Sequence, residues 1–138
     1  MAIKLVGSVG AVIDTASKRV DKDGNAISAN AITAFSRASN VVTAATSSTD
    51  SQSANCYFGL HNSDSAVAAA TTVIDLIPLQ KGMLLEMDCN ANTAASQKYA
   101  RCRLTNSTTL DNQADRTTSS DIFEILDIIA KAPSISLD

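Results

Sequence analysis

Residues 82–89, which read GMLLEMDC, decide the fold class of this chain. A period of two is typical of a half-buried β-strand, because successive side chains of a strand point to opposite faces. The QKG triplet at residues 80–82 predicts a turn just before this strand. The apolar face comprises Met83, Leu85, Met87 and Cys89, and the other face comprises Leu84, Glu86 and Asp88.

Residues 99–104 repeat this alternation. Ala100, Cys102 and Leu104 lie on one side, so Cys102 is expected in the core. The other side carries Tyr99, Arg101 and Arg103. Arginine is favoured at protein interfaces because its planar guanidinium binds carboxylates in a fixed fork geometry. We therefore take Arg101 and Arg103 as candidate contacts with a partner's carboxylates, against the alternative of a solvated face.

Further short runs favour strands over helices along the rest of the chain. Pro78 lacks a backbone donor, so a central strand in residues 66–78 must end there. Residues 121–130 fit a helix or a strand, and their β-branched and aromatic residues favour the strand. In the first part of the chain we expect apolar runs at 3–6 and 9–14 around a turn at 7–10, and a hairpin tip at 21–25. Residues 32–35 and 40–45 fit short strands or a helical turn. A surface loop is expected at 46–55, followed by an apolar run at 56–60 and a polar turn at 61–65.

Together these patterns predict a mainly β protein. Residues 1–45 would form an N-terminal arm and hairpin region, and residues 46–138 a compact β domain. The chain has 138 residues, which suits one structural unit of ordinary size. Aromatic residues make up only 4% of it and Trp is absent, so small aliphatic side chains must fill the core.

Charge and composition disfavour several classes of protein. The net charge is −3 and the 11 basic residues are scattered, whereas nucleic-acid binding needs a clustered Lys/Arg surface. No apolar stretch is long enough to span a bilayer as a helix. Three cysteines without CxxC spacing indicate reduced thiols, and hence assembly in a cytosol.

Candidate metal sites are incomplete. Residues 21–25 (DKDGN) resemble the opening of a calcium loop, but an EF-hand has glycine sixth and glutamate twelfth, whereas here Gly24 is fourth and Ile32 twelfth. A hairpin turn explains this stretch better. Zinc would need one imidazole with three thiolates, and packing explains those cysteines equally well. That set would be Cys56, His61, Cys89 and Cys102.

Candidate catalytic groups are equally sparse, and we expect no enzyme and no cofactor. His61 with Ser63 and Asp64 sits in one short stretch, where three neighbours do not line up as nucleophile, base and orienter. Two carboxylate pairs, Glu86 with Asp88 and Glu124 with Asp127, would serve acid–base chemistry only inside a cleft. We expect the first pair on a solvated face.

Residues 77–88 (IPLQKGMLLEMD), the polar stretch through Ala95 and Ser96, and residues 121–127 (DIFEILD) resemble the barrel part of capsid decoration, or cement, proteins of tailed phages. The resemblance covers roughly residues 57–130. It implies a small antiparallel β-barrel or β-tulip/sandwich with an extended N-terminal arm. Such a protein binds the outside of an assembled capsid, as a homo-oligomer with a trimer favoured. The major capsid protein would be the partner, and the virion, assembled in the host cytoplasm, the location.

An N-terminal arm that pins the lattice is also implied by the resemblance, with Lys4 and Leu5 as candidate contacts. Small Ser, Thr and Ala side chains lose little entropy when ordered, which suits an arm that folds on docking. Deleting residues 1–17 should then weaken attachment more than stability. The alternatives are a self-assembling coat or tail-tube subunit and a surface adhesion module.

Overall fold

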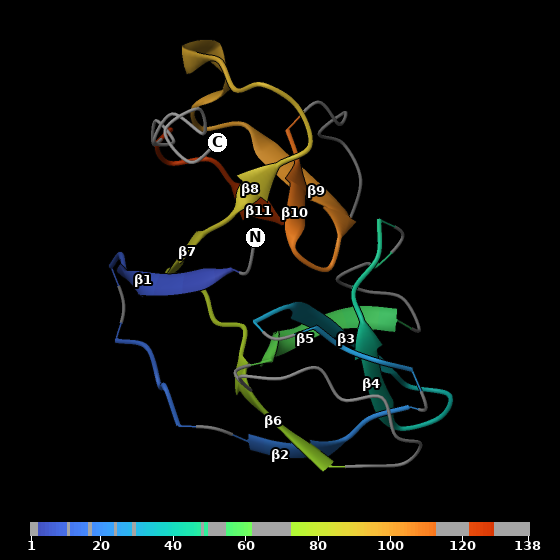
Figure 1. Cartoon of the computed structure of the whole chain (residues 1–138). Helices are drawn as coiled ribbons and strands as arrows, with labels where there is room; N and C mark the ends of the chain where they lie inside the picture. Colours follow the sequence, from blue (N-terminus) through green and yellow to red (C-terminus); the bar gives the residue numbers. More distant parts are fainter. Residues whose placement is uncertain are drawn as a thin grey trace, which may run out of the picture.

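Three β-sheets build the part of the chain that the computed structural model describes (Figure 1). The described residues are 3–10, 12–16, 18–23, 25–28, 30–47, 49, 55–61, 73–112 and 122–128. The strands are β1 (Lys4–Ser8), β2 (Lys18–Asp21), β3 (Ile32–Ser36), β4 (Val41–Ala44), β5 (Asn55–His61), β6 (Val73–Pro78), β7 (Met83–Glu86), β8 (Asp88–Cys89), β9 (Arg101–Asn106), β10 (Thr109–Asp111) and β11 (Phe123–Glu124), with one 3-10 turn, η1 (Ala95–Gln97).

The largest sheet is antiparallel and curls into a half-barrel. Its strand order is β2-β6-β5-β3-β4, so it combines strands from both sides of residue 45. The curl brings the edge strands together at a bridge between Lys22 and Val42, where the Asp23 N–H donates to the Val42 carbonyl at 3.0 Å. An apolar cluster of Ile27, Ala31, Val42, Ile74 and Leu76 packs with this sheet.

A β-bulge in β5 shapes this sheet. Thr33 pairs with Gly59 while Ala34 pairs with Tyr57, so Phe58 is the extra residue, and its ring packs 5.3 Å from that of Phe35. Gly59 lies so close to β6 that an added Cβ would stand 2.5 Å from Leu76 Cδ1 and 2.8 Å from the Ile77 carbonyl oxygen. Any side chain at position 59 would therefore collide with β6, and only glycine fits there.

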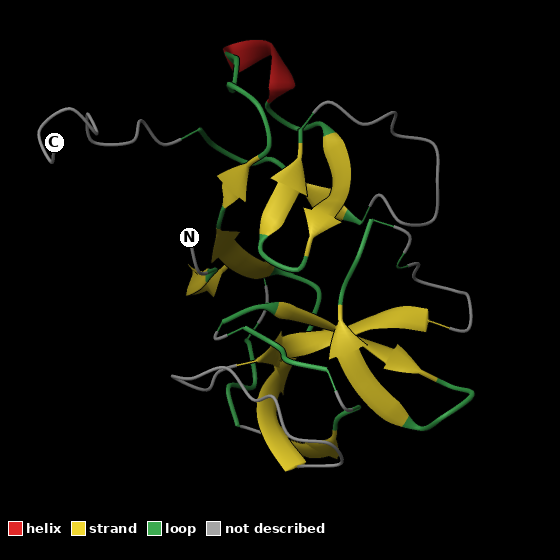
Figure 2. Cartoon of the chain, turned by 45° about the vertical axis from the view of Figure 1, so that its right-hand side comes forward, coloured by secondary structure: helices red, strands yellow, loops and turns green. Residues whose placement is uncertain are grey.

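The main core lies where the three sheets meet. The second sheet has the order β11-β9-β10-β8, and β1 and β7 form a two-stranded ribbon between it and the half-barrel (Figures 1 and 2). In this second sheet, the only parallel pair among the described strands is β10 with β8. The buried members of this core are Ile3, Ile32, Ala34, Ala45, Leu60, Cys102, Leu104, Leu110 and Ile125.

Several predictions are confirmed. The chain is mainly β, with antiparallel sheets and one sheet curled as a half-barrel. In β9, Cys102 and Leu104 are buried while Arg101 is exposed, as the alternation predicts. β6 ends at Pro78, and a turn at 80–82 precedes β7. Residues 32–35 and 40–45, for which a strand and a helical turn were both possible, are strands, because they pair as the β3–β4 hairpin.

The predicted strand over residues 83–89 is divided in two. It changes partners at Met87: β7 pairs with β1, whereas β8 pairs with β10. The side-chain pattern survives the break, because Leu85, Met87 and Cys89 all pack against the main core. Glu86 and Asp88 are half-buried, so the solvated face expected for them is wrong.

Two local predictions are wrong because pairing with distant strands decides the backbone. β1 runs through Gly7, where a turn was expected, since β7 supplies its partners. The 21–25 stretch is no hairpin tip: β2 pairs with β6. In the surface loop expected at 46–55, Thr46 and Ser47 are exposed as predicted, whereas Thr49 is buried, and its hydroxyl accepts a hydrogen bond from the Thr46 N–H at 2.9 Å.

The end of the described chain holds only a short strand. Within 122–128, β11 spans Phe123–Glu124 and no residue is helical, so the strand interpretation holds for two residues. The reason is that β9 supplies just two paired positions, Cys102 and Arg101. Asp121, Ile129 and Ala130 lie outside the described residues.

Candidate interaction surface

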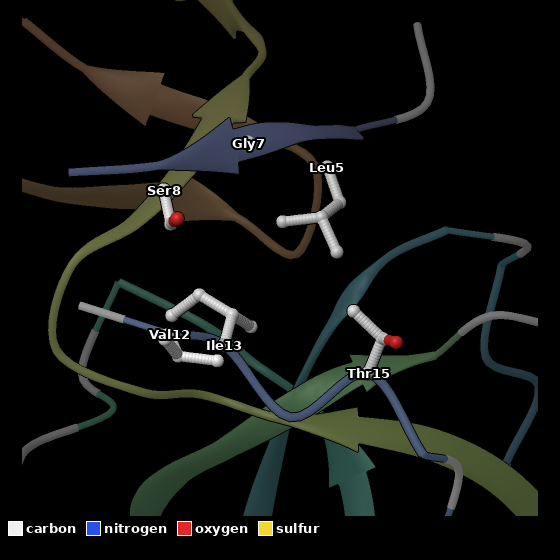
Figure 3. Close-up of a pocket in the computed structure, with 6 residues that line it drawn as sticks. All are labelled: Leu5, Gly7, Ser8, Val12, Ile13 and Thr15. Carbon is white, nitrogen blue, oxygen red and sulfur yellow. The ribbon is translucent and has the colours of Figure 1, made fainter.

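A bulge in β1 sets the direction of its side chains. Leu5 pairs with Leu85 and Gly7 with Leu84, so Val6 is the extra residue. One extra residue reverses the alternation, which brings Leu5 and Ser8 to the same side of the strand. Both point into an open hollow of about 470 Å³ between β1 and residues 12–15 (Figure 3). Its lining residues are Leu5, Gly7, Ser8, Val12, Ile13 and Thr15.

The segment that follows β1 is fixed to the turn before β7. The Val9 N–H donates to the Gly82 carbonyl at 2.8 Å. The Gln80 side chain accepts from the Asp14 N–H at 3.0 Å and donates to the Asp14 carbonyl at 2.7 Å. These contacts come from a part of the chain far away in sequence. They fix Val9 and Asp14 in place, and Val12, Ile13 and Thr15 around Asp14 line the hollow.

Three valines on this segment face water. Val6 is 56% exposed, Val9 55% and Val12 97%. Single exposed aliphatic residues are ordinary, whereas a contiguous group of them is typical of a binding surface. We call Val6, Val9 and Val12 the N-terminal strip. Sequence patterns missed it, because an apolar run predicts burial.

The predicted contact residues of the arm lie on β1. Lys4 is exposed and stands opposite Glu86 of β7. Leu5 is half-buried against the main core and lines the hollow. Ile3, just before them, is only 1% exposed, and its N–H donates to the Asn30 carbonyl at 3.1 Å. The N-terminus thus supplies a core residue, so deleting residues 1–17 would remove part of the core along with the strip.

The two predicted arginines differ in their surroundings. Arg103 is half-buried, and its Nε lies 3.7 Å from Asp111 Oδ2 across the β9–β10 pair. Arg101 is exposed and stands opposite Glu124 of β11. Among the described side chains, neither Arg101 nor Glu124 takes part in an ion pair or hydrogen bond. Arg101 is therefore the one whose charge is open to a partner.

Next to Arg101, the backbone turns Tyr99 outward. Ile125 accepts from the Tyr99 N–H and donates its own N–H to the Ala100 carbonyl at 3.0 Å, so two residues oppose one, as in a β-bulge. Tyr99 has a φ of 68°, a left-handed conformation that bulky side chains rarely adopt. Its side chain is 68% exposed. No sequence signal predicts this conformation, because it depends on hydrogen bonds to a distant segment.

The candidate metal and catalytic residues do not come together. Among the described residues, no three His, Cys, Asp or Glu side chains gather as a metal site. His61 ends β5 and is fully buried, with Nδ1 at 3.0 Å from the Ser28 carbonyl, so the polar turn predicted there is wrong at its first residue. Its buried Nε2 has no hydrogen-bond partner in the described part of the chain. Ser63 and Asp64 lie outside the described residues.

In residues 21–25, the stretch that resembles a calcium loop, the carbonyl oxygens bind the side chain of Lys22 from the same stretch. Lys22 is fully buried, and its Nζ donates to the carbonyls of Asp23 and Asn25. The Asp23 carboxylate accepts from the Asn25 N–H and from Asn25 Nδ2, each at 3.0 Å. An ammonium group thus occupies a position among carbonyl oxygens such as a cation would take.

Among the described titratable groups, one is clearly perturbed. The pKa of Cys89 is raised, first by burial and then by the nearby Cys102 and Asp88. A raised pKa keeps the thiol protonated and therefore unreactive at neutral pH. Cys89 belongs to the packing of the main core.

Comparison with protein-family models, with curated proteins and with solved structures finds no match for this chain. In the described ranges, no helix has the length and apolar composition that crossing a membrane requires.

Proposed function

We propose that this protein is a structural component that attaches through its N-terminal strip to the outside of a larger protein assembly. The observation that carries the proposal is the fixed presentation of Val6, Val9 and Val12, which are 56%, 55% and 97% exposed. Their segment is held by hydrogen bonds from Val9 to Gly82 and between Asp14 and Gln80. A segment already ordered before docking loses less entropy on binding.

Following the resemblance to decoration proteins, the assembly would be a tailed-phage capsid and the partner its major capsid protein. The contact area of three valines is small, so one copy would bind weakly. Many copies on a repeating shell compensate for this, because multivalent display raises the effective concentration at each site. Lys4 and the aliphatic wall of the hollow around Leu5 extend the same surface.

The test is cosedimentation with empty shells that lack the protein, compared with light scattering of the protein alone. Wild-type protein should sediment with shells and stay small without them. A V6S/V9S/V12S variant should lose attachment, whereas V73S should not, because Val73 is 48% exposed on β6. Spontaneous growth into particles would favour a self-assembling coat or tail-tube subunit. Indifference to shells, with binding to cell surfaces instead, would favour an adhesion module.

A further inference from the structure

A second surface is formed by β9, β11 and the residues next to them. Cys102 and Ile125 are buried, whereas Arg101, Glu124 and Leu126 beside them are exposed. We call this surface the Tyr99 face. Its members are Arg101 of β9 and Glu124 of β11, with the exposed residues Tyr99, in the turn before β9, and Leu126, after β11.

The composition of this face is that of a protein interface. Tyrosine and arginine are the residues that most often dominate binding energy, particularly beside apolar neighbours. Tyr99 is 68% exposed and Leu126 38% exposed. Beside them Lys98 Nζ lies 3.5 Å from Asp127 Oδ1 and 5.9 Å from the centre of the Tyr99 ring.

The backbone holds Tyr99 in a strained conformation that presents the ring to water. A left-handed φ at a bulky residue persists only where the surroundings enforce it, and such strain gathers at functional sites. Here the enforcing contacts are the hydrogen bonds from Tyr99 to Ile125 and from Ala100 to Gln97, the latter at 3.1 Å. The ring is 68% exposed, so it is available to a partner.

The charges of the face are arranged so that the surface complements itself. Basic groups lie along β9 and the turn before it, and acidic groups lie along β11 and the residues after it. Arg101 stands directly opposite Glu124, and Lys98 is beside Asp127. A two-fold axis parallel to the strands, between these two rows, would place each basic row over the acidic row of a second copy. Such a contact is isologous, because each residue pair occurs twice.

We propose that two copies of this chain associate through the Tyr99 face about such a two-fold axis. Arg101 of one copy pairs with Glu124 of the other, and Tyr99 packs on Leu126 of the other. Arg101 and Glu124 fit this role because neither side chain has an ion-pair or hydrogen-bond partner among the described residues. The proposal does not depend on what the N-terminal strip attaches to.

Sedimentation equilibrium from about 1 μM to about 1 mM, the range of weak to moderate affinities, tests this association. Wild-type protein should approach twice the monomer mass. R101E gives each copy an acidic face and E124R gives each a basic face, so both variants should be monomeric, with affinity reduced about tenfold or more. R37E, a charge reversal on the exposed β3–β4 turn, should associate like wild type.

Mixing R101E with E124R is the decisive arm of the experiment. In the mixture every charge pair across the axis is again opposite, so a mixed dimer should form. Restoration cannot come from folding, because each variant keeps its own like-charge pair within the chain. A monomeric wild type, a trimer, or no restoration in the mixture would overturn the proposal. If the wild type is monomeric and the R101E variant no longer binds shells, the Tyr99 face is the surface that contacts the shell instead.

Discussion

The side-chain amide of Gln80 forms a two-way hydrogen-bond pair with the backbone of Asp14, 66 residues earlier in the chain, at 3.0 and 2.7 Å. An amide group imitates here the donor and acceptor that a neighbouring strand would offer. The pair fastens the segment carrying Val12 to the turn between β6 and β7. Together with the Val9–Gly82 backbone hydrogen bond, this side chain ties the segment to a turn far away in the sequence.

Replacing Gln80 by alanine should release residues 12–16 with little effect on the rest of the fold. Both hydrogen bonds are exposed, so the free energy of unfolding should fall by about 0.5–1.5 kcal/mol. Hydrogen exchange of the Asp14 amide should accelerate much more than that of amides in β9. K81A, a change at the exposed neighbouring residue, is the control. Unchanged exchange at Asp14 in Q80A would contradict the fastening role.

Tyr99 allows stability and association to be separated. Y99G should be more stable than Y99A by about 1 kcal/mol, because glycine adopts a φ of 68° without the steric penalty that any Cβ meets. Both variants lack the ring, so both should lose self-association to the same degree. Urea unfolding measures the first effect and sedimentation the second. If Y99G were the less stable of the two, the strain assigned to this residue would be refuted.

The regular elements of this fold could be predicted from sequence because they depend on local pattern. Alternation in β9 identifies Cys102 as buried, and Pro78 ends β6 because proline lacks a donor. The bulges at Val6 and Phe58 could not be predicted, since a bulge exists only relative to a partner strand. A single extra residue then redirects the side chains that follow it.

The candidate surfaces were predicted only in part, for a related reason. Arg101 and Arg103 share one face of a strand in sequence, but of these two only Arg103 lies near Asp111 on the neighbouring strand. Tyr99 is exposed through hydrogen bonds to Ile125, which no local pattern encodes. The three exposed valines contradict the rule that apolar runs are buried, and such an exception is what a binding surface produces.

Gly59 should tolerate no side chain. In G59A the new Cβ would meet Leu76 Cδ1 at 2.5 Å and the Ile77 carbonyl oxygen at 2.8 Å, and a backbone atom of a paired strand cannot move aside. Overpacking of this kind costs about 1–3 kcal/mol, measurable as a lower urea midpoint. Adding L76V should recover only part of the loss, because the carbonyl contact remains. Complete recovery of stability would show that only the Leu76 side chain, and not the Ile77 carbonyl, excludes a Cβ at position 59.

Cys89 should make stability fall at alkaline pH. Burial, Cys102 and Asp88 raise the pKa of its thiol in the folded protein, so above about pH 8.5 the unfolded chain loses this proton first. The folded state then binds more protons than the unfolded state, and its stability decreases as pH rises through the folded pKa; below pH 8.5 the contribution is fully present.

The measurement is urea unfolding between pH 7 and pH 10 for wild type and C89A. All other ionisable groups are the same in the two proteins, so the difference between the two curves isolates the thiol. C89A should be less stable at pH 7, because a half-buried core side chain is shortened, and its deficit should shrink as pH rises. A deficit that stays constant or grows with pH would mean that the folded protein does not hold this proton more tightly.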